Sequence, residues 1–212
     1  MRLYDYASSG NCYKVRLLLA QLGIEYERVP VDIFAGDTLT DEFARINPER
    51  TTPVLVRDGA RPLTESNAIL LHLAEGTHLI PEDATARAQA YRWLFFEQAT
   101  VLPAIAGLRF RLVTGRLAPD HPGAARRRAD GEQALAVLDR ELSEHEFLAG
   151  RDYSVADISV YAYVHVAGDA GYELPEGVRG WIGRVEAQPR HMNDLEPYPE
   201  NAQLGMGRSI YG

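Results

Sequence analysis

The spacing of hydrophobic and polar residues changes character between residues 76 and 84 of this 212-residue chain. Before that point, short β-branched or alternating runs are interleaved with helical stripes. From Ala84 onward the hydrophobic positions recur at helical spacing. This change predicts an α/β domain over 1–76, a linker over 77–83, and an all-α domain with an extended C-terminal tail over 84–212.

The first 46 residues predict a compact order of elements. Strands over 2–6 and 26–31 flank a helix over 13–22, which ends at Gly23, a common helix stop. Two strands joined by one helix at this length form a βαβ unit with a right-handed crossover. A modest helix is expected over 41–46 in the polar segment that follows.

Residues 51–75 carry the most informative pattern. The β-branched run 53–56 predicts a strand buried on both faces, and an Asp-Gly turn leads to a returning hairpin arm over 61–64. An apolar stripe then predicts a helix with Ser66 as its N-cap. These elements complete a βαβ–ββα order.

Two features of this stretch point to ligand binding. Proline cannot donate to a sheet ladder, so Pro53 is expected at the first strand position, where a cis bond after Thr52 turns the Thr52 backbone outward. Glu65 and Ser66 place a carboxylate beside a helix start, whose free N–H groups attract anions. The pair suits the ammonium and carboxylate groups of an α-amino-acid ligand. An ordinary helix cap with a solvated glutamate is the alternative.

The strand, the expected cis-proline, the hairpin and the run Thr64-Glu65-Ser66-Asn67-Ala68-Ile69 together resemble the cytosolic glutathione S-transferases, including their theta-, delta- and bacterial Nu-like members. The resemblance implies a thioredoxin-like α/β glutathione-binding domain followed by an all-α C-terminal helical domain. It also implies that Thr52 pairs with the cysteinyl backbone of glutathione, with Pro53 as its hinge, while Glu65 and Ser66 hold the γ-glutamyl end.

The same resemblance concerns the glycine end of glutathione. In theta-like members the segment that corresponds to 36–47 contacts this end of the ligand. Thr38 and Arg50 flank the place where the ligand would emerge, and Arg50 would neutralise the glycine carboxylate. A solvated surface arginine is the alternative for Arg50.

The loop over 8–15 is where a thiol would be activated. It joins the first strand to the first helix, and α/β folds bind ligands at the carboxyl ends of strands. A free thiol has a pKa of about 8.5, and lowering it by about two units needs roughly 2.7 kcal/mol of preference for the thiolate. One or two hydrogen bonds to the charged sulfur supply that, at about 1.5–3 kcal/mol each.

Two neutral donors in this loop fit the chemistry. Ser9 falls where theta- and delta-like transferases carry their catalytic serine, and Asn11 matches an asparagine of Nu-like members. Many relatives have a proline where this chain has Asn11, so both candidates stay open. Cys12 offers mixed-disulfide chemistry as an alternative, but its place in the first helical turn favours a buried structural thiol. For the strand tyrosines, Tyr4 and Tyr6, core packing is the preferred interpretation.

The resemblance places a second substrate between this loop and the long helix that begins at Ala84. Phe95, Phe96, Gln98, Ala99, Leu102 and Arg109 are candidates to line its site. Aromatic residues at helical spacing more often pack in a core, which is the alternative for Phe96.

The helical domain has its own clear signals. A long helix is expected over 84–116, and Pro103 should kink or break it. A second long helix is expected over 124–143. Ser154 followed by Asp157 predicts a capping box before a buried helix, with a structural role only.

The composition of the chain argues against several classes of binding partner. The formal net charge of −8 is spread over both halves of the chain, which disfavours nucleic acid and anionic membranes. No apolar run is long enough to span a bilayer and no signal core is present, so a cytoplasmic location is expected. The single cysteine excludes an internal disulfide framework, and the six histidines show no ligand-type pairing, so no metal is expected.

The resemblance therefore implies a homodimeric enzyme that activates the thiolate of its co-substrate glutathione for attack on an electrophilic small molecule. One alternative is glutathione-dependent disulfide or peroxide reduction, as in Nu-like members. Another is a binding module that keeps the fold without catalysis. The presence of Ser9, Pro53, Glu65 and Ser66 together favours an enzyme.

Overall fold

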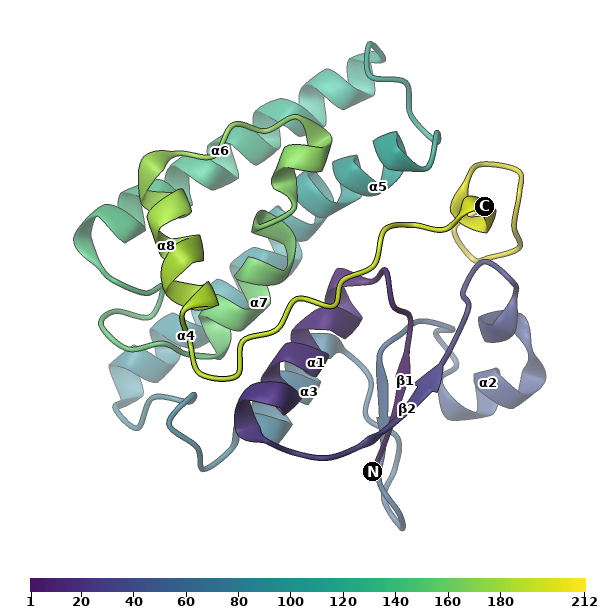
Figure 1. Ribbon diagram of the computed structural model, residues 1–212, viewed down its shortest axis with the longest axis horizontal. Helices are drawn as coiled ribbons and strands as arrows, with labels where there is room; N and C mark the ends of the chain where they lie inside the picture. Colours follow the sequence, from purple (N-terminus) through teal and green to yellow (C-terminus); the bar gives the residue numbers. More distant parts are fainter. The chain divides into compact units, whose positions relative to one another are not determined.

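The computed structural model describes residues 1–212, which form two compact units. The first unit contains Met1–Leu73 together with Met192–Gly212, and the second contains Ala74–His191. The C-terminal tail thus packs with the α/β unit, whereas the sequence analysis assigned it to the helical domain (Figure 1). We call residues 192–212 the C-terminal strap. It is held to the first unit by hydrogen bonds from the Ser8 hydroxyl to the Pro197 carbonyl at 2.8 Å and from Arg208 N to the Phe34 carbonyl at 2.7 Å.

The sheet of the first unit has three strands in the order β2-β1-β3. β1 (Arg2–Asp5) pairs in parallel with β2 (Glu27–Pro30), as expected for a βαβ unit, and antiparallel with β3 (Val54–Val56). The returning arm expected over 61–64 is reduced to a single antiparallel bridge between Leu55 and Leu63. Pro62 supplies a reason, because it has no N–H to extend the ladder.

Three α-helices accompany the sheet, namely α1 (Gly10–Leu22), α2 (Asp41–Ile46) and α3 (Ser66–Ala74). α1 begins three residues earlier than its apolar stripe predicts because Ser9 caps it, and it ends at Gly23 in the left-handed conformation. α3 begins at Ser66, and the carbonyl of Glu65 accepts the first helical bond, from Ile69 N at 2.9 Å. Glu65, with φ of 66°, therefore occupies the N-cap position that was expected for Ser66.

The second unit is all-helical (Figure 1). The expected long helix consists of α4 (Ala84–Phe96), η2 (Glu97–Ala106) and α5 (Gly107–Val113). η2 is a π-helical segment that contains Pro103, so the proline widens the helix rather than ending it. The remaining long helices are α6 (Pro122–Glu144), α7 (Val155–Val164) and α8 (Glu176–Glu186). No helix in the structure is both long and apolar enough to cross a membrane.

The start of α7 confirms the expected capping box. The carboxylate of Asp157 accepts from Ser154 N at 3.0 Å and also from Leu148 N and Trp181 Nε1, both at 2.9 Å. All of α7 is buried. This one carboxylate therefore links the start of α7 to the preceding loop at Leu148 and to α8 at Trp181 by hydrogen bonds within the helical core.

Candidate active site

Ser9 lies at the junction of β1 and α1. Its backbone is extended, with φ of −87° and ψ of 122°, and its Oγ accepts a hydrogen bond from Cys12 N at 3.3 Å. A serine hydroxyl accepts through its lone pairs and donates through its single O–H. Ser9 can therefore cap α1 and donate to a ligand at the same time.

Cys12 is fully buried behind Ser9. Its Sγ accepts from Tyr6 N at 3.4 Å, and the nearby side chains of Ser9 and Thr52 lower its pKa against the effect of burial. Burial raises the pKa of Cys12 to about 12, so the thiol stays protonated at neutral pH. These properties fit the structural role expected for Cys12. They also show that Ser9 and Thr52, which are far apart in the sequence, approach the same sulfur atom.

The Thr52–Pro53 peptide bond is cis, as the sequence analysis expected. Pro53 is buried directly before β3, while Thr52 is half-buried. The Thr52 backbone thus stands at the end of the sheet near Ser9.

Asn11 connects the start of α1 to the start of α3. Its Oδ1 accepts a hydrogen bond from the hydroxyl of Ser66 at 3.0 Å. Ser66 is buried and Glu65 is exposed. The carboxylate of Glu65 and the N-terminal N–H groups of α3 consequently adjoin the first turn of α1, and the amide nitrogen of Asn11 can donate to a ligand.

Thr38 and Arg50 form a second polar group in the same unit. Arg50 donates through Nη1 to the carbonyls of Thr38 at 2.9 Å and Thr40 at 3.2 Å, and its Nη2 lies 4.0 Å from the exposed carboxylate of Asp41. The hydroxyl of Thr38 is buried and has no hydrogen-bond partner within the protein. The structure therefore brings Thr38 and Arg50 together.

The two strand tyrosines pack as the sequence analysis expected. The Tyr4 ring meets Phe43 edge-on at 6.2 Å, and the Tyr6 ring meets Phe34 edge-on at 5.9 Å. Tyr6 is buried, and this burial raises its pKa to about 12. Both rings stabilise the fold of the first unit.

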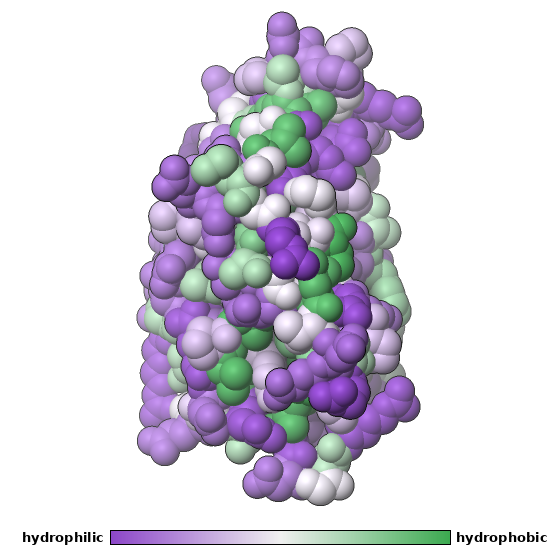
Figure 2. Space-filling model, turned by 90° about the vertical axis from the view of Figure 1, so that its right-hand side faces the viewer, coloured by the Kyte–Doolittle hydropathy of each residue, from purple (hydrophilic) through white to green (hydrophobic).

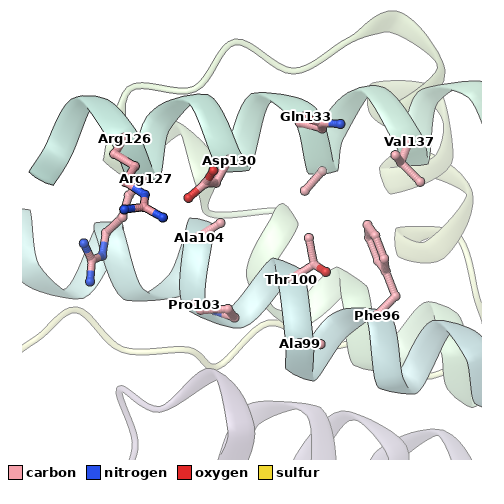
Figure 3. Close-up of a pocket in the computed structure, with 11 residues that line it drawn as sticks. Phe96, Ala99, Thr100, Pro103, Ala104, Arg126, Arg127, Asp130, Gln133 and Val137 are labelled. Atoms are coloured by element: carbon pink, nitrogen blue, oxygen red, sulfur yellow. The ribbon is translucent and has the colours of Figure 1, made fainter.

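Phe96 and Arg109 belong to the helical unit and have different neighbours. The Phe96 ring packs edge-on against Trp93 at 5.1 Å and lines a cavity of about 620 Å³ between η2 and α6 (Figure 3). Arg109 is largely buried and donates through Nε to Asp169 at 2.8 Å. The cavity is also lined by Thr100, Gln133 and Val137, and by Arg126 and Arg127.

Sequence reasoning did not identify the residues that tie the C-terminal tail to this site. Arg16 in α1 is fully buried, and it pairs with Asp5 at 2.6 Å and with Asp194 of the tail at 2.9 Å. The available signal was an arginine between the hydrophobic residues Val15 and Leu17 of α1, but its partner in the tail has no local pattern that reveals it.

The fold and these groups together define a class of protein. A thioredoxin-like α/β unit presents neutral hydrogen-bond donors at one helix start and a carboxylate at a second, and an all-helical unit follows. Residues 8–75 match the family model described as "Glutathione S-transferase, N-terminal domain".

Similar proteins cover most of the chain. Glutathione S-transferase 2 from Anopheles gambiae is 34% identical, with 81% of this chain and 82% of the relative covered. The disulfide-bond oxidoreductase YfcG from Escherichia coli is 29% identical, with 96% and 97% covered. A glutathione S-transferase structure from Pseudomonas fluorescens superposes with a TM-score of 0.88 and 40% identity, covering 92% of this chain and 98% of that one. The chain belongs to the glutathione S-transferase family and is an enzyme of that class.

Proposed function

We propose that this enzyme binds glutathione along the Thr52–Pro53 edge of the first unit and activates its thiol through Ser9. The observation that supports this most strongly is the convergence of Ser9, Thr52 and the Asn11–Ser66 pair at the adjoining starts of α1 and α3. These residues come from three separate segments of the chain, and each presents the kind of group that one part of the tripeptide requires.

The expected arrangement of glutathione follows from those groups. The backbone of Thr52 pairs with the cysteinyl residue, because the cis bond at Pro53 leaves it available at the end of β3. Glu65 accepts from the γ-glutamyl ammonium group, and the backbone N–H groups at the start of α3, including that of Ser66, donate to the neighbouring carboxylate. Thr38 and Arg50 hold the glycine end, with the half-buried guanidinium of Arg50 contacting the glycine carboxylate and the Thr38 carbonyl positioning that guanidinium at 2.9 Å.

The chemical step needs a thiolate rather than a strong base. The hydroxyl of Ser9 donates to the sulfur, with the amide of Asn11 as a second donor, and the thiol proton passes to solvent. Each hydrogen bond to the anion is worth about 1.5–3 kcal/mol, which lowers the thiol pKa by one to two units. The thiolate then attacks an electrophilic small molecule, and the electrophile's leaving group departs with the bonding electron pair.

Calorimetry and turnover test this proposal in sequence. We expect glutathione to bind with measurable heat at millimolar concentration, and we expect a chlorinated dinitroaromatic to be conjugated. An absence of heat would favour a binding module that does not use glutathione.

Disulfide reduction is the second candidate because YfcG matches nearly the full chain. In that reaction the glutathione thiolate attacks a disulfide, and a second glutathione completes the exchange. Turnover of a hydroxyethyl disulfide that exceeds conjugation of the dinitroaromatic would assign the enzyme to this activity.

For the second substrate, Phe96 and Arg109 are the contacts we propose from the helical unit. Trp93 and Asp169 hold these two side chains in place. Phe96→Ala and Arg109→Leu are expected to raise the KM for the electrophile more than the KM for glutathione. The reverse ranking would remove them from the site.

We also propose a cytoplasmic homodimer with a role in detoxification. The helical unit exposes two large hydrophobic side chains, Phe95 at 74% and Val137 at 39%, which a partner copy could cover. Phe95→Asp is expected to shift the mass in analytical ultracentrifugation from dimer to monomer. Leu204→Asp, a change at an exposed apolar residue of the tail, serves as the control that should stay dimeric.

A further inference from the structure

Arg16 in α1 is a fully buried cation that joins the strap to the loop carrying Ser9. Its Nε donates to both carboxylate oxygens of Asp194 at 2.9 Å, and its Nη1 donates to Asp5 at 2.6 Å. Its Nη2 donates to the carbonyl of Ala7, two residues before Ser9, at 3.1 Å. A buried guanidinium is stable only where its N–H groups are paired, so Arg16 fixes these partners relative to one another.

The strap also contacts the same loop directly. Glu196 N donates to the carbonyl of Ala7 at 3.3 Å, and the hydroxyl of Ser8 donates to the carbonyl of Pro197 at 2.8 Å. The Ala7 carbonyl therefore accepts from the strap backbone and from the guanidinium that the strap carboxylate holds. Both residues that precede Ser9 are fixed by contacts outside their own loop.

The position of the Ser9 hydroxyl depends on this loop. Ser9 N donates to the carbonyl of Tyr6 at 3.0 Å, which closes a single turn. The hydroxyl accepts from Cys12 N at 3.3 Å, a longer bond than is typical for N–H···O. Since a displacement of about 1 Å can strongly weaken a catalytic contact, whatever holds the loop affects how well this hydroxyl meets a ligand sulfur.

The end of the strap is held in a different place and mainly by polar contacts. Leu204 and Met206 are 59% and 61% exposed, and Ile210 is exposed as well. Figure 2 views the side on which Figure 1 draws the end of the chain, and hydrophobic side chains appear there among hydrophilic ones. Asn201 Nδ2 donates to Asp32 at 2.8 Å. This contact anchors the strap to the loop after β2, which does not carry Ser9.

We propose that Asp194 is a positioning residue for the thiol-activating Ser9. Its carboxylate orients the Arg16 guanidinium, which holds the Ala7 carbonyl and so keeps the Ser9 hydroxyl directed at the glutathione sulfur. Asp194 itself does not contact the ligand and exchanges no proton. This inference rests on the proposed function.

The direction in which the thiol pKa changes distinguishes positioning from a direct effect of charge. Removing a carboxylate removes negative charge from the protein, which by itself favours the thiolate and lowers the thiol pKa. Releasing the loop weakens the hydrogen bond from Ser9 to the sulfur instead, which raises the thiol pKa.

The test is a titration of the thiolate absorbance of bound glutathione against pH. We expect Asp194→Ala to raise the thiol pKa by about half a unit to one unit, a roughly three- to tenfold loss of thiolate at pH values below it, with little change in the Kd for glutathione. Asp194→Asn keeps one oxygen acceptor for Arg16 and should give a smaller rise, which also decides the question if the alanine variant does not fold. Asn201→Ala removes a strap contact that does not reach the Ser9 loop, so this control should leave the thiol pKa near its wild-type value.

A double-mutant cycle tests whether Asp194 acts through Ser9. In the Ser9→Ala background, Asp194→Ala should no longer raise the thiol pKa, because the hydroxyl that it positions is gone. An undiminished rise in that background would contradict the proposal.

The other outcomes separate this inference from the proposed function. If Ser9→Ala raises the thiol pKa but the folded Asp194 variants lower it or leave it unchanged, the Asp194 assignment is wrong while the proposed function stands. If Asp194→Ala and Asn201→Ala raise it equally, the strap acts through general packing and the assignment is also wrong. If wild type neither binds glutathione nor lowers its thiol pKa, both proposals fail.

Discussion

At the scale of single residues, the site depends on side chains that serve the fold and the ligand together. Ser9 is the helix cap of α1, and its remaining donor is the one proposed for sulfur. Ser66 holds Asn11 and stands at the anion-binding start of α3. Substitutions at these positions must therefore be assessed by both stability and kinetics, with a neighbour as control.

Ser9→Ala should reduce conjugation more than Cys12→Ala does. Removing the proposed donor raises the thiol pKa by about one unit or more, so turnover at neutral pH falls by roughly tenfold or more. The lost cap also costs about 1 kcal/mol of stability. Cys12→Ala is expected to lower the melting temperature by opening a small cavity, with a smaller kinetic loss. If Cys12→Ala is the inactivating change, the donor assignment is wrong.

Glu65→Gln should weaken glutathione binding without unfolding the protein. The exposed Glu65 carboxylate is expected to accept a charge-assisted hydrogen bond from the γ-glutamyl ammonium group, and such bonds are worth about 1.5–3 kcal/mol. The Kd measured by calorimetry should therefore rise by roughly tenfold or more. Glu49→Gln, at another exposed glutamate of the first unit, is the control. Equal affinity in the two variants would exclude Glu65 from the site.

At the scale of elements, helix starts carry much of the structural and functional detail. The starts of α1 and α3 meet through Asn11 and Ser66 and provide the proposed ligand contacts. The start of α7 is closed by its capping box instead, and its acidic residue is completely buried. A helix start can thus serve binding or folding, depending on whether its polar groups already have partners.

Asp157→Ala should strongly destabilise the helical unit. Three buried donors, Leu148 N, Ser154 N and Trp181 Nε1, would lose their acceptor. Each unpaired buried donor costs about 1–3 kcal/mol, so the free energy of unfolding should fall by at least about 3 kcal/mol in a denaturant titration. Asp152→Ala, at an exposed position before the same helix, should change it by less than about 0.5 kcal/mol. A similar result for both variants would contradict this account.

At the scale of the whole molecule, the chain returns to its first unit after completing the second. The strap crosses the loops after β1 and β2, so the two ends of the sequence stabilise one unit. The helical unit ends in an aromatic cluster at His191, directly before the strap begins. There the His165 ring stacks on the Tyr161 ring with their centroids 4.5 Å apart, and the His191 ring packs edge-on against the same tyrosine with a centroid distance of 5.4 Å.

This cluster predicts a loss of stability in mild acid. Burial lowers the pKa of His165 and of His191, although Glu186 nearby acts in the opposite direction and Arg109 adds to the lowering at His165. The unfolded chain, with a histidine pKa of about 6.5, therefore binds protons that the folded chain does not. The contribution of the two neutral histidines to the free energy of unfolding is fully present above about pH 6.5 and is lost as the pH falls below it. A His165→Phe, His191→Phe variant should lose less stability than wild type between pH 7 and pH 5 in denaturant titrations, and parallel losses would refute the prediction.

Much of the fold and of the candidate site follows from local sequence pattern. Apolar spacing predicts the βαβ unit and the long helices, because burial of one face imposes the period of each element. The capping box at Ser154 was recognisable because its partners lie within one helical turn. Local backbone rules also identified four candidate binding residues. A proline at a strand start pointed to Thr52 and Pro53, and an expected helix start pointed to Glu65 and Ser66.

Other features depend on contacts between residues that are far apart in the sequence. Ser66 lies inside α3 rather than at its N-cap, and its hydroxyl donates to Asn11 in another segment. Arg109 pairs with Asp169, and the arm over 61–64 keeps a single bridge. Local propensity does not contain such information.

The sequence by itself determined the order of elements, the expected cis-proline and the family resemblance, because these depend on neighbouring residues and on their periodicity. Only the tertiary structure decided where the C-terminal strap lies. The strap has no apolar period, and its position results from hydrogen bonds and an ion pair to Ser8, Arg16 and Phe34 near the other end of the chain. Such long-range pairings leave no periodic signal in the sequence, and for that reason the position of the strap could not be predicted from it.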